Sequence, residues 1–157
     1  MKMKQIVYNA CYGGFALSAI AEKMLYEAKH DGKKAYVYKV VFDTYYTPIR
    51  YKRIDDIEEL KSYDKYVDML HVYTKDFGKE FIDDRNLYLN KYELHTNKDN
   101  VDRKDKDLIK IIETLGRKVA STSLSNLKIA EVEDKWRIIE FDGRETVETP
   151  ESIKWNE

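Results

Sequence analysis

The segment from Asn9 to Ser18 holds the residues of this chain that are best suited to bind a ligand. It reads N-A-C-Y-G-G-F-A-L-S and follows an apolar run that predicts a strand. Gly13 and Gly14 leave backbone N–H groups unshielded just before a helix is expected to begin, and such a place suits an anion such as a phosphate. Tyr12 and Phe15 flank the glycines and offer flat faces on which a nucleobase can stack. We therefore expect a phosphate-and-base site here, with a tight connection that binds nothing as the alternative.

Spacing excludes other chemistries that use the same residue types. No Lys-Ser or Lys-Thr pair follows the glycines, as a Walker loop requires, and the third glycine of the dinucleotide fingerprint is missing. Cys11 precedes the expected helix, where a thiolate has a lowered pKa. A phosphatase of this kind needs an arginine six positions later, and Leu17 stands there. Cys11 is therefore kept as a ligand-binding candidate and not as a nucleophile.

A second group of polar residues precedes the clearest amphipathic segment, Asp107 to Leu115. Asp105 or Asp107 can accept hydrogen bonds from the first N–H groups of that helix. Arg103 at such an N-terminus can hold a phosphate with two hydrogen bonds, although an ordinary charged cap gives the same pattern. With the first loop, the candidate ligand-binding residues are Asn9, Cys11, Tyr12, Gly13, Gly14, Phe15, Ser18, Arg103 and Asp105.

The histidines of the chain are His30, His71 and His95, and none is spaced with another His, Cys or carboxylate as metal ligands are. No nucleophile elbow with a Ser-His-Asp order is present. The segment His71 to Thr74 has a superficial likeness to the paired His-x-Thr motifs of phosphodiesterases, without a second copy. We expect no metal, no cofactor and no catalytic residue. A hydrolase that uses His71 or His95 as an acid or base is the alternative.

The composition is that of a soluble globular protein with a heavily charged surface. Of 157 residues, 43% are hydrophobic and 36% are charged, and the net charge of −1 gives no general attraction to DNA or RNA. No apolar run is long enough to span a bilayer, and the single cysteine fits a reducing compartment, so we expect a cytoplasmic protein. The 13 tyrosines are unusual and favour pockets and interfaces, although the codon bias of an AT-rich genome also explains them.

The periodicity of the chain predicts an α+β fold, a single domain over residues 1–157 with a mixed or antiparallel sheet and two to four helices. Ser18 is expected to cap a helix over residues 19–29, and Asp142-Gly143 to turn a hairpin. The other expected helices cover residues 54–63 and 107–115. Strands are expected at residues 5–8, 34–42, 66–73, 87–94, 127–132, 136–141 and 145–147, with a connection at 43–48.

Four blocks in this order resemble a family of small phage proteins, the first type of Thoeris anti-defence sponge. The blocks are N-A-C-Y-G-G-F-A-L-S, R-x-D-x-D-L-I-x-x-I-E-x-L-G from Arg103, L-K-I-A-E-V from Leu127 and W-x-I-x-E-F-D-G-x-E from Trp136. Together they span nearly the whole chain. The chain departs from the family where a proline is usual near Val132, and where His-Arg often precedes the final Trp but Ile153-Lys154 stands here.

The resemblance implies a phage protein that acts in the cytoplasm of the infected bacterium. Such sponges bind the cyclic ADP-ribose isomer made by bacterial TIR-domain proteins and hold it without cleaving it. They assemble as homo-oligomers and bind cyclic oligonucleotides at a separate site. In this chain, the Gly13-Gly14 backbone would meet the diphosphate and Arg103 would supply charge. Besides the hydrolase, a protein-interaction module that blocks a host enzyme through a tyrosine-rich surface stays open as an alternative.

Overall fold

The computed structural model describes residues 3–41 and 49–150, so the connection expected at 43–48 and the C-terminal Ile153-Lys154 lie outside the described part. The chain divides into two compact units. The first unit consists of residues Met1–Leu17 and Thr96–Glu157, and the second unit of residues Ser18–His95. Both units combine helices with antiparallel strands, so the α+β prediction is confirmed. The prediction of a single domain stays a prediction.

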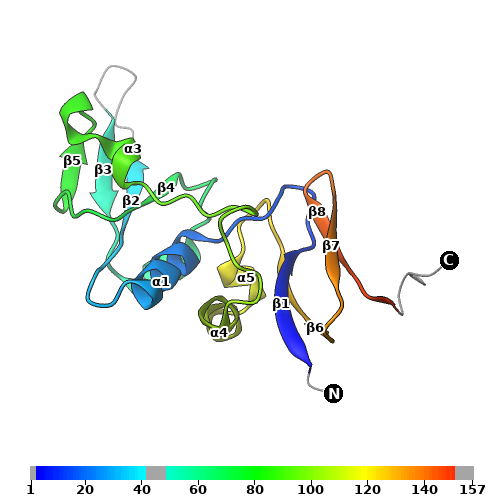
Figure 1. Cartoon of the computed structure of the whole chain (residues 1–157). Helices are drawn as coiled ribbons and strands as arrows, with labels where there is room; N and C mark the ends of the chain where they lie inside the picture. Colours follow the sequence, from blue (N-terminus) through cyan, green and yellow to red (C-terminus); the bar gives the residue numbers. More distant parts are fainter. Residues whose placement is uncertain (1–2, 42–48, 151–157) are drawn as a thin grey trace. The chain divides into compact units, whose positions relative to one another are not determined.

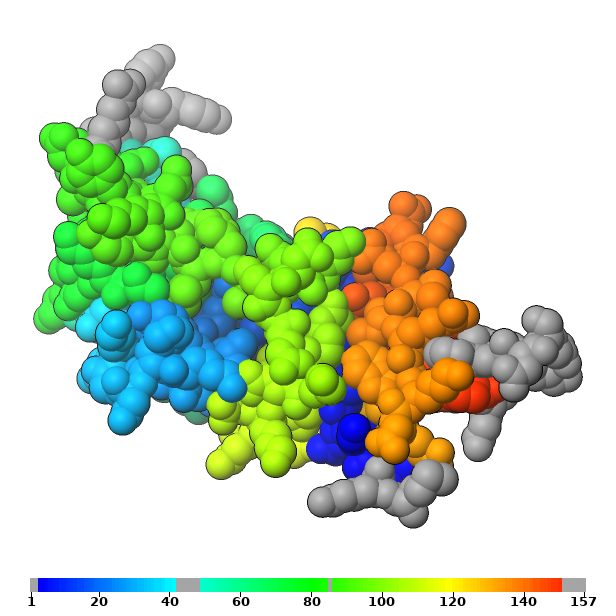
Figure 2. Space-filling view, in the orientation of Figure 1, coloured from blue at the N-terminus to red at the C-terminus, as the bar shows by residue number. Residues whose placement is uncertain are grey.

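The first unit pairs the two ends of the sequence (Figure 1). Its N-terminal strand runs antiparallel to a late strand, with Lys4 opposite Val132 and Asn9 opposite Leu127. A hairpin follows, closed at Asp142 and Gly143, as the sequence predicts. The elements of this unit are β1 (Lys4–Asn9), α4 (Lys106–Leu115), α5 (Arg117–Ala120), β6 (Leu127–Val132), β7 (Arg137–Phe141) and β8 (Arg144–Glu148). β7 is largely exposed, and its orange atoms form part of the surface in Figure 2.

In helix α4, local sequence determines where the helix begins, which face is buried and where it ends. Asp105 caps it by accepting hydrogen bonds from the N–H groups of Asp107 and Leu108, at 2.8 and 3.4 Å. Apolar residues recur at helical spacing, and Leu108, Ile109, Ile111 and Ile112 are buried. Gly116 ends the helix with a φ of 83°, which favours glycine. The helix therefore begins and ends where capping residues require it.

The second unit is built around a four-stranded antiparallel sheet in the order β4-β2-β3-β5. Its elements are α1 (Ala19–Lys29), β2 (Tyr36–Val41), β3 (Arg50–Arg53), α2 (Ile57–Ser62), β4 (Leu70–Tyr73), β5 (Glu80–Ile82), the 3-10 helix η1 (Arg85–Leu87) and α3 (Leu89–Tyr92). The core of the sheet is aromatic and centres on Tyr38, Tyr51 and Tyr73. The Tyr38 hydroxyl donates to the Gly78 carbonyl at 2.7 Å and accepts from Phe77 N–H at 2.9 Å. Burial raises the pKa of Tyr38, which keeps this hydroxyl protonated.

The structure differs from the sequence prediction mainly between residues 64 and 94. The strand expected at 87–94 is wrong, because η1 and α3 occupy most of this segment and only Glu93 forms a bridge, to Tyr73. The strand expected at 66–73 begins at Leu70, because the Asp64 carboxylate accepts from the N–H groups of Tyr66 and Val67 and holds a turn there. The described residues form five α-helices, one more than the expected maximum of four, and α3 and α5 have four residues each.

Candidate functional site

Asn9 joins three separate segments of the first unit. Its side chain is buried and donates to the carbonyls of Cys11 and Gly143, at 2.8 and 3.0 Å. Its amide oxygen accepts from the N–H groups of Cys11 and Asn126, at 3.3 and 2.8 Å. All hydrogen-bonding capacity of this amide is therefore used inside the protein, and Asn9 holds the loop in place instead of facing a ligand.

Two glycines bring the same segments into close backbone contact. A Cβ at Gly13 would lie 2.6 Å from the Cβ of Leu124, which is too close for any other residue without a shift. A Cβ at Gly143 would lie 2.7 Å from the backbone nitrogen of Gly14, and Gly143 has a φ of 85°. Gly14 has a φ of 96°, and a Cβ there would meet nothing within 4 Å. Gly13 and Gly143 thus allow close approach of the backbone, whereas Gly14 borders open space.

Arg103 lies in a buried ion pair with Glu145 of β8. Its two terminal nitrogens donate to the two carboxylate oxygens at 2.6 and 2.7 Å, and the side chains of Arg103 and Glu145 are 11% and 3% exposed. The guanidinium carbon lies 3.9 Å from the centre of the Phe15 ring, which is itself buried. The structure brings Phe15 and Arg103 together as part of the interior, whereas the sequence suggested both as ligand-binding residues. The cation expected for a phosphate is already paired with a carboxylate.

Asp105 and Ser18 act as helix caps, which is the role that their sequence positions also predict. Asp105 caps α4 as described above. Ser18 lies at the start of the second unit and caps α1, where its hydroxyl accepts from Ala21 N–H at 3.3 Å. Glu22 in the first turn of α1 is buried and forms an ion pair with Lys65. These contacts account for both capping residues without a ligand.

The exposed part of the loop forms a small surface that we call the Tyr12 surface, made of Tyr12, Gly13, Gly14 and Arg144. Tyr12 is 58% exposed, and the guanidinium of Arg144 lies 5.5 Å from the centre of its ring. Arg144 also donates to the Tyr12 hydroxyl at 3.4 Å, and it has no ion pair with any described carboxylate. Within the described residues, the N–H groups of Gly13 and Gly14 donate no hydrogen bond. The free thiol of Cys11 lies next to this surface and is partly exposed.

Arg144 is the residue of this surface that sequence reasoning missed. It occupies the variable position of the W-x-I-x-E-F-D-G-x-E block, directly after the Asp142-Gly143 turn. A two-residue turn places the next side chain at the end of the hairpin. The Asp142-Gly143 turn could therefore have indicated that Arg144 lies at the end of a hairpin. It could not have indicated that Tyr12 packs against this hairpin end.

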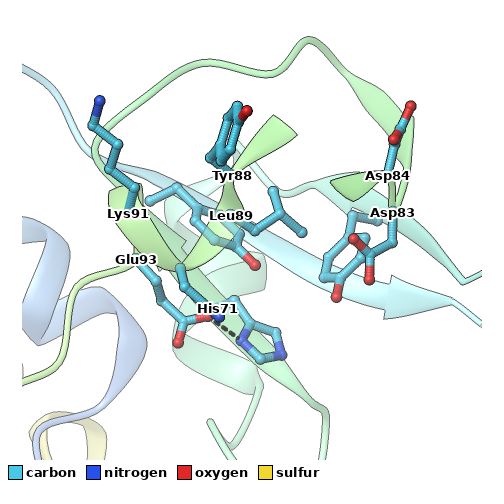
Figure 3. A pocket seen from close by; sticks show the side chains of 10 residues that line it. His71, Asp83, Asp84, Tyr88, Leu89, Lys91 and Glu93 are labelled. Atoms are coloured by element: carbon cyan, nitrogen blue, oxygen red, sulfur yellow. Dashed lines mark hydrogen bonds and ion pairs between the residues drawn. The ribbon is translucent and has the colours of Figure 1, made fainter. Parts of the chain in front are cut away.

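A second candidate site is a cavity of about 560 Å³ in the second unit (Figure 3). It lies beside β3, β4 and α3. Its aromatic walls are Tyr51, Tyr73 and Tyr88, and its charged or titratable side chains are His71, Asp83, Asp84, Lys91 and Glu93. Sequence reasoning named His71 and His95 as possible acid or base groups but did not include the carboxylates.

Glu93 is the centre of a hydrogen-bonded cluster at this cavity. One of its carboxylate oxygens lies 2.8 Å from His71 Nδ1, and the other lies 3.1 Å from His95 Nε2. The negative charge of Glu93 also acts on Tyr73 and raises the pKa of its hydroxyl, after the larger effect of burial. The hydrogen bond from His71 is the main cause of a lowered pKa of Glu93, whereas burial raises the pKa of Tyr73 and of Tyr51. At neutral pH the cluster therefore holds a carboxylate anion and two neutral phenols.

The lowered pKa predicts how the stability of this cluster depends on pH. A carboxyl whose pKa is lower in the folded than in the unfolded protein stabilises the fold above its ordinary pKa, 4.5 for Glu93. That contribution is lost as the pH falls through the lowered pKa. We expect Glu93→Gln to be less stable than the wild type at pH 6, with a difference that shrinks as the pH falls below 4.5 and through the lowered pKa of Glu93. Urea midpoints at each pH measure this, and a difference independent of pH would contradict it.

No group of His, Cys, Asp or Glu side chains in the described part is arranged to hold a metal ion. Among the helices formed by residues 3–41 and 49–150, none combines the length and apolar character needed to cross a bilayer.

Comparison with known proteins gives no relative for this chain. Neither a protein-family model, nor a curated protein, nor a solved structure matches it. The function therefore has to be argued from the residues and geometry of the two candidate sites.

Proposed function

We propose that the protein binds and sequesters a cyclic ADP-ribose isomer made by TIR-domain immune proteins, without cleaving it. The observation that carries this proposal is the Tyr12 surface, where an exposed ring, a guanidinium and two N–H groups that donate to no described residue lie together. A cyclic ADP-ribose isomer offers an adenine for the ring and a diphosphate for the cation and the N–H groups. The resemblance of the N-A-C-Y-G-G-F-A-L-S block to the phage sponge family also supports it.

In this proposal, Tyr12 stacks on the base and Arg144 replaces Arg103 as the cation that meets the diphosphate. Arginine suits this role because its planar donors match phosphate oxygens. The buried contacts of Asn9, Arg103 and Glu145 hold the loop and the hairpin end in fixed positions. A site that is already ordered before binding loses less conformational freedom when the ligand arrives. Ground-state binding of this kind needs no catalytic group.

We further propose that the protein acts in the cytoplasm of an infected bacterium as a homo-oligomer. The family resemblance suggests both the location and the assembly, as well as a separate site for cyclic oligonucleotides. DNA and RNA are not expected partners, because the net charge of −1 provides no general attraction to a phosphate backbone.

Titration calorimetry with cyclic ADP-ribose isomers tests the proposal. We expect tight binding by the wild type, and Tyr12→Ala and Arg144→Gln should each weaken it about 5- to 150-fold, because a base–aromatic contact contributes about 1–3 kcal/mol and a charge-assisted hydrogen bond a similar amount. Both side chains are at the surface, so the fold should be retained.

Arg137→Gln is the matched control, because Arg137 is an exposed arginine on the neighbouring strand β7 and does not belong to the Tyr12 surface. Its affinity should equal that of the wild type. Wild-type affinity in Tyr12→Ala and Arg144→Gln would remove the site assignment. An absence of binding by the wild type would remove the proposed ligand and leave a protein target as the better explanation.

A hydrolase that uses the His71–Glu93 pair is the second candidate function, because this pair lines a cavity large enough for a small molecule. The carboxylates of Asp83 and Asp84 in the same cavity repel a diphosphate. This repulsion favours binding of the nucleotide at the Tyr12 surface, without cleavage, over hydrolysis in the cavity. Release of the bound ligand by heat, followed by mass analysis, separates the two functions. A ligand of unchanged mass supports sequestration, and a changed mass supports hydrolysis.

The third candidate function, inhibition of a host enzyme through a tyrosine-rich surface, is weakened because several of the tyrosines are not at the surface. Tyr38, Tyr51 and Tyr73 are buried in the core of the second unit and are not available to a partner. Binding of the nucleotide signal by the purified protein alone would separate the proposed function from this one.

A further inference from the structure

Among the described side chains that line the cavity of the second unit, carboxylates outnumber ammonium groups. Asp83, Asp84 and Glu93 line it, and the Asp83 carboxylate has no hydrogen bond or ion pair with any described residue. Lys91 is the ammonium group in the lining, and its nitrogen lies 5.5 Å from the centre of the Tyr92 ring. Figure 3 shows the Lys91 ammonium pointing away from Asp83 and Glu93. Lys91 therefore does not neutralise Asp83, whereas the Glu93 carboxylate is already bound by His71 and His95.

The walls of the cavity add aromatic rings to these carboxylates. Tyr51 and Tyr73 are buried, and one face of Tyr51 is stacked on Phe81 with ring centres 4.7 Å apart. Both phenols stay neutral, because burial raises their pKa values. Tyr88 is 67% exposed and has a φ of 52°, a backbone conformation that is costly for a residue with a large side chain. Electron-rich ring faces attract cations, most strongly where water is partly excluded.

We propose that this cavity binds a small organic cation, an ammonium group carrying apolar substituents, between the tyrosine rings and the carboxylate of Asp83. Its volume of about 560 Å³ lies in the range of small-molecule sites. Carboxylates supply the charge that an ammonium ion needs, and the rings supply contact with its apolar substituents. A phosphate-bearing ligand carries the same negative charge as the carboxylates of this cavity and is repelled by them, so this site is independent of the Tyr12 surface and of the nucleotide proposed there.

Choline and its neutral isostere 3,3-dimethyl-1-butanol are the probes that test this inference on the full chain. The two molecules have nearly the same shape, so a difference in affinity reports the positive charge. Protein NMR titration should show at least tenfold tighter binding of choline, with shifts of the Tyr51, Tyr73 and Tyr88 ring signals. Equal affinities, or no binding of choline, would overturn the inference.

Two exposed positions allow the site to be altered without loss of the fold. Tyr88→Ala removes one ring and Asp83→Asn removes one charge, and each should weaken choline binding at least fivefold. Glu58→Gln is the matched control, because Glu58 is an exposed carboxylate of the same unit that does not line the cavity. Circular dichroism checks that all three variants are folded. Choline affinity that is unchanged in both Tyr88→Ala and Asp83→Asn would place the binding elsewhere and overturn the assignment.

Discussion

Replacing Glu145 by glutamine should lower the free energy of unfolding by about 3–5 kcal/mol. Arg103 would keep its charge in a buried place, and its pairing carboxylate would become a neutral amide. An uncompensated buried charge is among the largest penalties that a single substitution causes. Glutamine keeps an oxygen that can still accept a hydrogen bond from Asn9 N–H. The loss in free energy of unfolding is therefore due mainly to the loss of the ion pair. Urea unfolding followed by circular dichroism measures the difference.

Glu140→Gln is the control for this result. Glu140 pairs with Lys98 through a comparable contact of 3.0 Å, but their side chains are 36% and 50% exposed. Solvent screens such a pair, and its loss should cost less than about 1 kcal/mol. Equal effects of Glu140→Gln and Glu145→Gln would show that burial does not distinguish the two pairs and would contradict the role given to Arg103.

Phe15→Ala should also destabilise the protein by about 3–5 kcal/mol, because the ring is 7% exposed and its loss leaves a cavity under the Arg103 guanidinium. This expectation replaces a direct stacking role for Phe15 in ligand binding. Thermal unfolding and nucleotide titration should be measured together. A large loss of stability, with normal affinity in the fraction that stays folded, is the expected outcome.

Phe141→Ala supplies the comparison, since Phe141 is 73% exposed in the same unit. Its truncation should change stability by no more than about 0.5 kcal/mol. If Phe15→Ala instead kept wild-type stability and lost nucleotide affinity, Phe15 would have to face the ligand.

The sequence was most informative where residues at the ends of a segment, such as caps and turns, mark where a helix or strand begins and ends. Helix α1 begins and ends at Ala19 and Lys29 as predicted, because Ser18 caps it and the chain turns at Asp31-Gly32. Strand β6 likewise covers the predicted Leu127–Val132. The segment from Leu87 to Leu94 shows the limit of this reasoning. Its alternating pattern suits a strand, but Tyr88 has a positive φ and the chain turns into α3, where Tyr92 packs against the aromatic core.

The ion pair of Arg103 could not be predicted from the sequence, although the helix cap next to it, Asp105, could. The partner of Arg103, Glu145, lies 42 residues further on, in a hairpin that the Asp142-Gly143 turn identifies. Nothing in either segment indicates that the strand after the turn lies beside Asn9 and Arg103. The same reason hides the cluster at Glu93, because His71 lies 22 residues earlier, on strand β4. Local patterns predict elements and caps, whereas these pairings depend on how distant elements pack.

The division of the chain also orders the events of its synthesis on the ribosome. The second unit is one continuous stretch, Ser18–His95, so all of its strands have emerged before most of the first unit exists. Strand β1 is made first but has to wait for β6, because 117 residues separate Asn9 from Asn126. During that time Ile6 and Val7, which are fully buried in the finished protein, have no native strand to cover them. Until β6 is made, strand β1 is therefore an unpaired apolar segment of the kind that chaperones protect from aggregation.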